Sequence, residues 1–163
     1  AEGAGKDEIT ILWGSMYGMT SKAVDYAEGI LQREGVKYNK LKMPLTGESE
    51  MVATVFRSAG IIIAAPTYEY RLFPPVAAAL NELGRKKITG KAAFRFGSYG
   101  WSGGAEKELS EIIERNKMNW DFIESVEFEG APKEEDLLKV EAGVSELIKK
   151  MREKVVEVHQ GSI

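Results

Sequence analysis

The sequence predicts an α/β protein built on a parallel β-sheet, and three observations lead to this prediction. First, five short apolar segments alternate along the chain with five segments of helical periodicity. Second, the apolar segment "GIIIAAP" contains no polar residue, which is typical of a parallel strand covered on both faces. Third, a length of 163 residues suits one domain with a full core.

The first half of the chain contains two predicted strands and two predicted helices. Residues 8–14, "EITILWG", form an apolar, partly β-branched run that predicts a buried strand. From Thr20, apolar residues recur at helical spacing up to Gly35, which suits a helix C-cap. Residues 36–43 alternate in polarity and predict a less buried strand. Residues 48–58 predict a helix. Its apolar face is expected to contain Val52, Val55 and Phe56.

The second half continues the alternation. After "GIIIAAP", the segment "FPPVAAALNELG" predicts a helix with prolines in its first turn, where a missing N–H matters least. "KAAFRFG" predicts a fourth strand, residues 103–117 a helix, and "NWDFIESVEFEG" one longer fifth strand at a sheet edge. Residues 133–155 predict a final amphipathic helix. Its apolar face contains Leu137, Val140, Val144, Leu147, Ile148 and Met151.

Composition excludes several classes of function. The chain has no cysteine, so it has neither disulfides nor thiolate metal sites. Its single histidine, His159, lies in the polar segment "EVHQGSI" and lacks the partners that metal or triad chemistry requires. A net charge of −3 without a basic block indicates no nucleic-acid surface. No apolar run is long enough for a bilayer and no signal-peptide pattern is seen. We expect a cytoplasmic location without a membrane partner.

The chain is expected to contain one domain, residues 8–154. Residues 1–7 begin with "AEGAGK", lack an initiator methionine and are interpreted as a linker or a cut end. Residues 155–163 are interpreted as a polar C-terminal tail.

Three loops that follow predicted strands have unusual compositions. They are "GSMYGMT" after the first strand, "PTYEYRLF" after the third and "GSYGWSGG" after the fourth. Ligands of open parallel sheets bind beyond the carboxyl ends of the strands, so all three loops should lie at that edge. Their convergence predicts a binding site.

The first loop suits a phosphate group. A strand, a tight turn and a helix N-terminus direct several backbone N–H groups toward one point, with the helix dipole behind them. Ser15 and Thr20 add hydroxyl donors, and the loop has no lysine. The spacing is neither that of a Walker motif nor G-x-G-x-x-G. The alternative is that Ser15 and Thr20 only cap the helix.

The other two loops suit a flat ring. Tyr68, Tyr70, Tyr99 and Trp101 can form a slot for a planar heterocycle, or they can simply cover the ends of the core. Glycines would let the backbone approach the ring closely; they are Gly97, Gly100, Gly103 and Gly104. A phosphate at one end and a planar ring at the other indicate flavin mononucleotide (FMN).

Three longer segments resemble a known family. "ILWGSMYGMTSKAVDYAEGI", "GIIIAAPTYEYRLFP" and "FRFGSYGWSGGAEKELSEII" are similar to the flavodoxin-like domain of the flavodiiron proteins, also called A-type flavoproteins. The resemblance spans about residues 8–154. It implies a flavodoxin-like three-layer sandwich with a five-stranded parallel sheet in the order 2-1-3-4-5.

The resemblance also implies which residues bind FMN. Residues 15–20 would bind the phosphate, and residues 66–69 and 98–103 would border the isoalloxazine ring. The expected cofactor-binding residues are Ser15, Met16, Tyr17, Gly18, Met19, Thr20, Pro66, Thr67, Tyr68, Glu69, Ser98, Tyr99, Gly100, Trp101 and Gly103. No catalytic acid or base and no metal ligand is expected.

Several positions depart from the family pattern. The family usually has a polar residue at the position of Trp13 or Gly14, often serine at Ala65, commonly asparagine at Glu69, and a small or apolar residue at Arg95. A charge in a central parallel strand is costly unless it is paired. We therefore expect Arg95 to reach a carboxylate at the loop edge, with Glu69 as one candidate. The alternative is that it extends through a gap to solvent.

The leading functional prediction is an FMN electron-transfer domain. In the family, the flavin feeds a metallo-β-lactamase-like domain whose two irons reduce O₂ or NO, and a rubredoxin or a reductase supplies the electrons. These 163 residues contain no such domain, so the chain is expected to be an excised piece or a separately encoded donor, and the missing methionine favours the former. A homodimer is compatible with this prediction. Two alternatives stay open: a stand-alone FMN-dependent NAD(P)H:quinone or flavin reductase, and a flavodoxin-like module without a cofactor.

Overall fold

The centre of the molecule is a parallel sheet. The computed structural model describes residues 5–100 and 103–161 of the chain. The strands are hydrogen-bonded in the order β2-β1-β3-β6-β7, and β8 also pairs with β6. Their bounds are β1 Lys6–Trp13, β2 Lys37–Lys42, β3 Ser58–Ala64, β6 Ala92–Tyr99, β7 Asp121–Phe122 and β8 Val126–Glu129. This is the predicted order 2-1-3-4-5, and every residue of β3 is buried, as its apolar sequence indicated.

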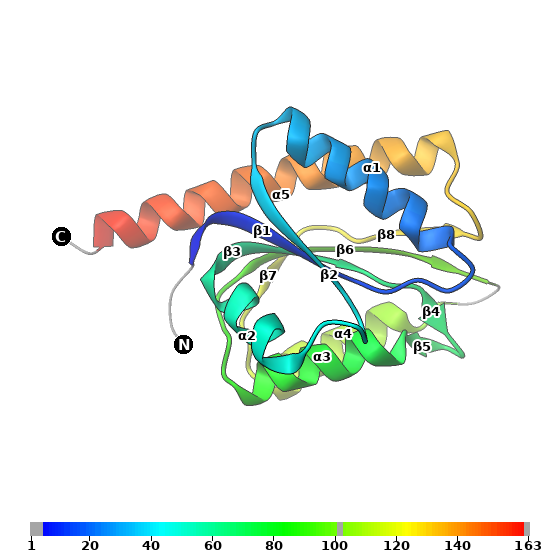
Figure 1. Cartoon of the computed structure of the whole chain (residues 1–163), viewed down its shortest axis with the longest axis horizontal. Coiled ribbons are helices and arrows are strands. Elements are labelled where there is room, and N and C mark those ends of the chain that lie inside the picture. The colour runs from blue at the N-terminus through cyan, green and yellow to red at the C-terminus, as the bar shows by residue number, and fades with distance from the viewer. Residues whose placement is uncertain (1–4, 101–102, 162–163) are drawn as a thin grey trace.

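Helices cover both faces of the sheet. Figure 1 shows α1 (Met19–Arg33) and α5 (Glu134–Gly161) on one face and α2 (Glu48–Arg57), α3 (Pro74–Arg85) and α4 (Ala105–Arg115) on the other. Each face has its own apolar core. The three-layer flavodoxin-like fold is confirmed. None of the helices that the structure describes combines the length and apolar character needed to span a membrane.

Local signals in the sequence account for the helix ends. Gly35 follows α1 with a φ of +67°, and the Val36 N–H donates to the Leu31 carbonyl, which confirms the predicted C-cap. Proline occupies the first positions of α3, as predicted. One expectation for α2 was wrong. Phe56 of α2 is 49% exposed, because Met51 and Val55 face the core instead.

The predicted single fifth strand is two short strands. β7 and β8 both pair in parallel with β6, so the edge position is confirmed. Between them the register shifts: Ala93 pairs with Phe122, whereas Phe96 pairs with Val126. The three residue steps from Ala93 to Phe96 on β6 therefore lie opposite four steps, from Phe122 to Val126, on the neighbouring segment. One extra residue bulges out and interrupts the ladder.

The final helix is longer than predicted. α5 continues to Gly161, so the segment interpreted as a tail from residue 155 begins inside the helix. Its predicted apolar positions from Val140 to Met151 are buried against the sheet, and Leu137 packs at their margin.

Candidate functional site

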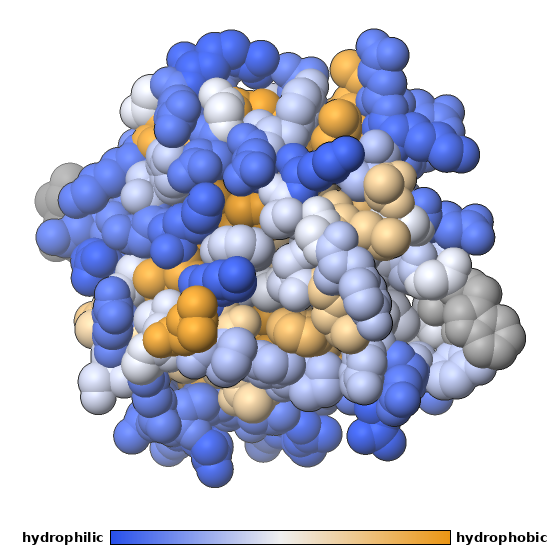
Figure 2. Space-filling view, turned by 45° about the vertical axis from the view of Figure 1, so that its right-hand side comes forward, coloured by the Kyte–Doolittle hydropathy of each residue, from blue (hydrophilic) through white to orange (hydrophobic). Residues whose placement is uncertain are grey.

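The three predicted loops meet at the carboxyl edge of the sheet. They surround a pocket of about 340 Å³, within the usual size range of small-molecule sites. Figure 2 shows neutral and weakly apolar side chains across the middle of the molecule's face, with strongly hydrophilic ones above and below. The lining residues are Met16, Tyr17, Met19, Pro66, Thr67, Tyr68, Glu69, Tyr70, Ser98, Tyr99, Gly100 and Gly130.

The first loop presents free hydrogen-bond donors. Tyr17 and Gly18 both have positive φ, 58° and 73°, which turns the chain tightly before α1. Within the described chain, no group accepts from the backbone N–H groups of residues 15–18. The Ser15 hydroxyl is buried and has no hydrogen-bond partner. α1 has no side-chain cap, so the alternative that Ser15 and Thr20 only cap this helix is not supported.

Thr20 has a different environment from Ser15. Its side chain is fully buried, and its hydroxyl shares a hydrogen bond of 3.1 Å with the Ser98 hydroxyl. The Ser98 N–H also donates to it at 3.4 Å. Thr20 therefore ties the first loop to the third. Of the predicted first-loop residues, Ser15, Gly18 and Thr20 are not among those that line the pocket.

The second loop is a small hairpin that the sequence analysis missed. β4 (Thr67–Tyr68) pairs antiparallel with β5 (Arg71–Leu72). Glu69 and Tyr70 connect them with φ values of 46° and 67°, the conformation that asparagine and glycine usually supply. The Thr67 hydroxyl is buried without a partner.

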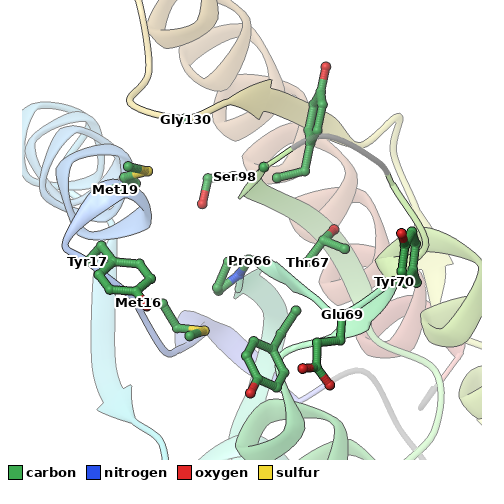
Figure 3. A pocket seen from close by; sticks show the side chains of 12 residues that line it. Met16, Tyr17, Met19, Pro66, Thr67, Glu69, Tyr70, Ser98 and Gly130 are labelled. Carbon is green, nitrogen blue, oxygen red and sulfur yellow. The ribbon is translucent and has the colours of Figure 1, made fainter.

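Aromatic rings border the pocket, as predicted. Tyr68, Tyr70 and Tyr99 line it, and Tyr17 joins them from the first loop. Figure 3 shows Tyr17 on one side of the pocket and Tyr70 on the other, with Pro66 between. Tyr17 is 90% exposed and Tyr70 57% exposed, so these rings do not cover the core. The predicted Trp101 lies outside the described residues.

The glycines of the third loop have different roles from those expected. A Cβ on Gly97 would overlap the Ala65 carbonyl oxygen, and a Cβ on Gly104 would overlap that of Tyr70. Both glycines are thus required by backbone packing beside the pocket. Gly100 lines the pocket with open space around it. Gly103, one of the predicted site residues, lies near Glu127 and does not line the pocket.

Arg95 is paired, as predicted, but not with Glu69. The fully buried guanidinium contacts Glu127 at 3.1 Å and Glu106 at 3.3 Å, and donates to the Ala65 carbonyl at 3.0 Å. Glu69 lies on the hairpin turn and lines the pocket instead. Because the guanidinium turns toward α4 and β8, the Glu69 candidate was wrong.

The pocket carries little charge. Glu69 is the one acidic side chain among the lining residues, and no lysine or arginine is among them. An anionic group at this edge would therefore be bound by neutral N–H and O–H donors and by the dipole of α1.

Two lining residues were not in the predicted set. Tyr70 was named among the aromatic residues but not assigned to the cofactor. Gly130 was missed, although it follows β8 at the same edge and has a φ of +64°. The rule that loops after parallel strands share the carboxyl edge of the sheet would also have indicated Gly130.

Comparison with known sequences points to one group of proteins, although no family model matches the chain. The chain is 26% identical over 137 residues to a nitric oxide reductase of Moorella thermoacetica, covering 84% of this chain and 34% of that protein. It is 35% identical over 102 residues to an anaerobic nitric oxide reductase flavorubredoxin of Vibrio vulnificus, covering 61% of this chain and 21% of that one. The chain thus spans about a third or less of the length of these relatives.

Solved structures share the fold. Rubredoxin oxygen:oxidoreductase of Desulfovibrio gigas superposes with a TM-score of 0.85 at 20% identity, over 93% of this chain and 37% of that one. The flavodiiron protein of Giardia intestinalis superposes with a TM-score of 0.85 at 24% identity, over 94% of this chain and 38% of that one. An archaeal flavodoxin superposes with a TM-score of 0.76 at 18% identity, over 89% of this chain and 99% of that one.

Proposed function

Because the chain is a flavodoxin-like domain homologous to the flavin domain of the flavodiiron proteins, we propose that it binds FMN and transfers electrons. Bound FMN would supply the redox chemistry. The protein then has to bind the flavin, orient it and limit its contact with water. No side chain has to act as a catalytic acid or base.

The first loop is proposed to bind the FMN phosphate. The observation that carries the proposal is the combination of free N–H groups at residues 15–18 with the buried, unpartnered Ser15 hydroxyl. A buried donor without a partner is costly, and a phosphate oxygen would remove that cost. The dipole of α1 favours an anion at the same point.

The rest of the pocket is proposed to hold the isoalloxazine ring. Tyr68 and Tyr99 offer flat surfaces for stacking, and Pro66 and Gly100 form part of the wall. The buried Thr67 hydroxyl can donate to a polar edge of the ring. The residues thus fit both ends of FMN.

We further propose that the electrons pass to a di-iron, metallo-β-lactamase-like domain on the same or a partner chain. The names of the relatives, nitric oxide reductase and rubredoxin oxygen:oxidoreductase, support a reductase as the destination. This chain corresponds to about a third of those proteins. A rubredoxin or a reductase would be the donor.

The test is to titrate the flavin-free protein with FMN and with riboflavin. We expect tight binding of FMN and clearly weaker binding of riboflavin, because the phosphate loop would have no ligand. No FMN binding would refute the proposal. Mixing the FMN-loaded protein with NADH under anaerobic conditions then separates the two redox functions: rapid bleaching of the flavin would favour the stand-alone reductase, and a stable yellow colour the electron-transfer domain.

A further inference from the structure

A large buried cation lies behind the pocket. Among the described residues, Arg95 is the largest side chain that is fully buried. One of its terminal nitrogens contacts both Glu106 and Glu127, and the other donates to the Ala65 carbonyl. A guanidinium can make these contacts together because its donors form a planar fork.

The three partners belong to three different segments around the pocket. Ala65 directly precedes Pro66, where the second loop begins. Glu106 lies in the first turn of α4, directly after the third loop. Glu127 lies in β8, which leads to Gly130. One side chain thus connects the bases of three of the four segments that line the pocket.

The surroundings are shaped for these contacts. The position of a Cβ on Gly97 would overlap the Ala65 oxygen and lie 3.1 Å from the Arg95 terminal nitrogen, so only glycine leaves this space open. The Ser125 hydroxyl donates to the second carboxylate oxygen of Glu106 at 2.9 Å, which fixes that carboxylate.

We propose that Arg95 is a positioning residue that holds the second loop, the third loop and the fifth strand at a fixed separation. It thereby preforms the ring end of the pocket, where small displacements matter most. The identity of the ligand as FMN rests on the proposed function, whereas the connection between the loops is a property of the protein alone. Lysine could not replace Arg95, because a single ammonium lacks the fork.

The variants are Arg95→Lys and Glu127→Gln, with Glu8→Gln as the matched control. Glu8 is a carboxylate in an ion pair with an arginine too, 3.1 Å from Arg57, but it lies in the amino-terminal half of β1, away from the pocket. Its replacement disturbs a comparable pair without touching the loops.

The first measurement is amide hydrogen exchange of the flavin-free protein. In Arg95→Lys, the amides of residues 67–72 and residues 97–100 should both exchange about tenfold faster, because they lose the same anchor. Residues 37–42 of β2, at the opposite edge of the sheet, should be unchanged. The control should leave both loops at the wild-type rate even where its thermal midpoint falls.

The second measurement is FMN binding. Arg95→Lys should weaken it about tenfold and alter the visible circular dichroism of the bound flavin, because the ring environment changes. Glu127→Gln should show the same changes to a smaller degree, and the control should bind within about twofold of wild type.

Wild-type loop exchange in Arg95→Lys and Glu127→Gln would overturn the inference, and so would equal acceleration of the loops in the control. If Arg95→Lys does not fold, Glu127→Gln decides, since that side chain is 26% exposed and its replacement is milder. If the wild-type protein binds no FMN, the proposed function fails, and the exchange measurement still decides the role of Arg95.

Discussion

Replacing Ser15 with alanine tests the phosphate site directly. The Ser15 hydroxyl is buried and unpartnered, so it contributes nothing favourable to the flavin-free protein. A hydrogen bond to a charged oxygen is worth about 1.5–3 kcal/mol. The Ser15→Ala change should therefore weaken FMN binding about 10- to 150-fold, at about 1.4 kcal/mol per factor of ten.

The sign of the effect on stability is the opposite. A buried hydroxyl without a partner costs about 1–3 kcal/mol, so the flavin-free Ser15→Ala protein should be at least as stable as wild type in urea unfolding. Riboflavin affinity should not change, because riboflavin has no phosphate. This combination, weaker FMN binding with undiminished stability, distinguishes a ligand contact from a structural one.

Isothermal titration of both flavins is the assay, and Ser21→Ala is the matched control. Ser21 lies in the first turn of α1, close to this loop, and its hydroxyl already donates to the Gly18 carbonyl at 2.7 Å. Its loss should affect FMN binding much less. Equal losses for FMN and riboflavin, or equal effects of the two serine variants, would refute the reasoning.

Three further predictions follow from single features. Gly104→Ala should loosen the hairpin and lower the thermal midpoint, because its Cβ would overlap the Tyr70 carbonyl oxygen; an unchanged midpoint would contradict this. Burial lowers the pKa of Lys91 to about 8, whereas the unfolded value is about 10.4. The unfolded chain therefore binds more protons between these values, and the free energy of unfolding should rise from pH about 8 to about 10 in wild type more than in Lys91→Met, as measured by urea unfolding. Glu69→Gln removes the one charged side chain among the lining residues and should raise the reduction potential of bound FMN. For a charge about 8 Å away at an effective dielectric of about 20, the change is about 2 kcal/mol, or about 90 mV per electron before salt screening. A spectroelectrochemical titration that shows no shift would mean that stacking outweighs charge.

The location of the site could be predicted because it depends on topology. Once five strands alternate with helices, the loops after the first, third and fourth strands must share one edge. That rule needs no knowledge of side-chain contacts. Gly130 was missed because its loop has no unusual composition, and only the same topological rule could have indicated it.

Details that depend on long-range contacts could not be predicted. The hairpin at residues 67–72 has strands of two residues, and its turn is Glu69–Tyr70 in place of the usual Asn-Gly, so no local signal marks it. The bulge between β7 and β8 is invisible in a pattern that alternates throughout. The partners of Arg95 come from α4 and β8, whose approach is set only by the finished fold.

The hydrogen bond between Thr20 and Ser98 connects the helix that follows the first loop to the strand that leads into the third. If the proposed function holds, an anion that orders the first loop would also order Ser98, and a ring that packs against Ser98 would also order Thr20. Inorganic phosphate should therefore act as a positive effector of riboflavin binding, and riboflavin should raise the affinity for phosphate by the same factor, because coupling between two sites is reciprocal. In Thr20→Val, which keeps the shape but removes the hydroxyl, the two halves of the cofactor would bind as independent ligands.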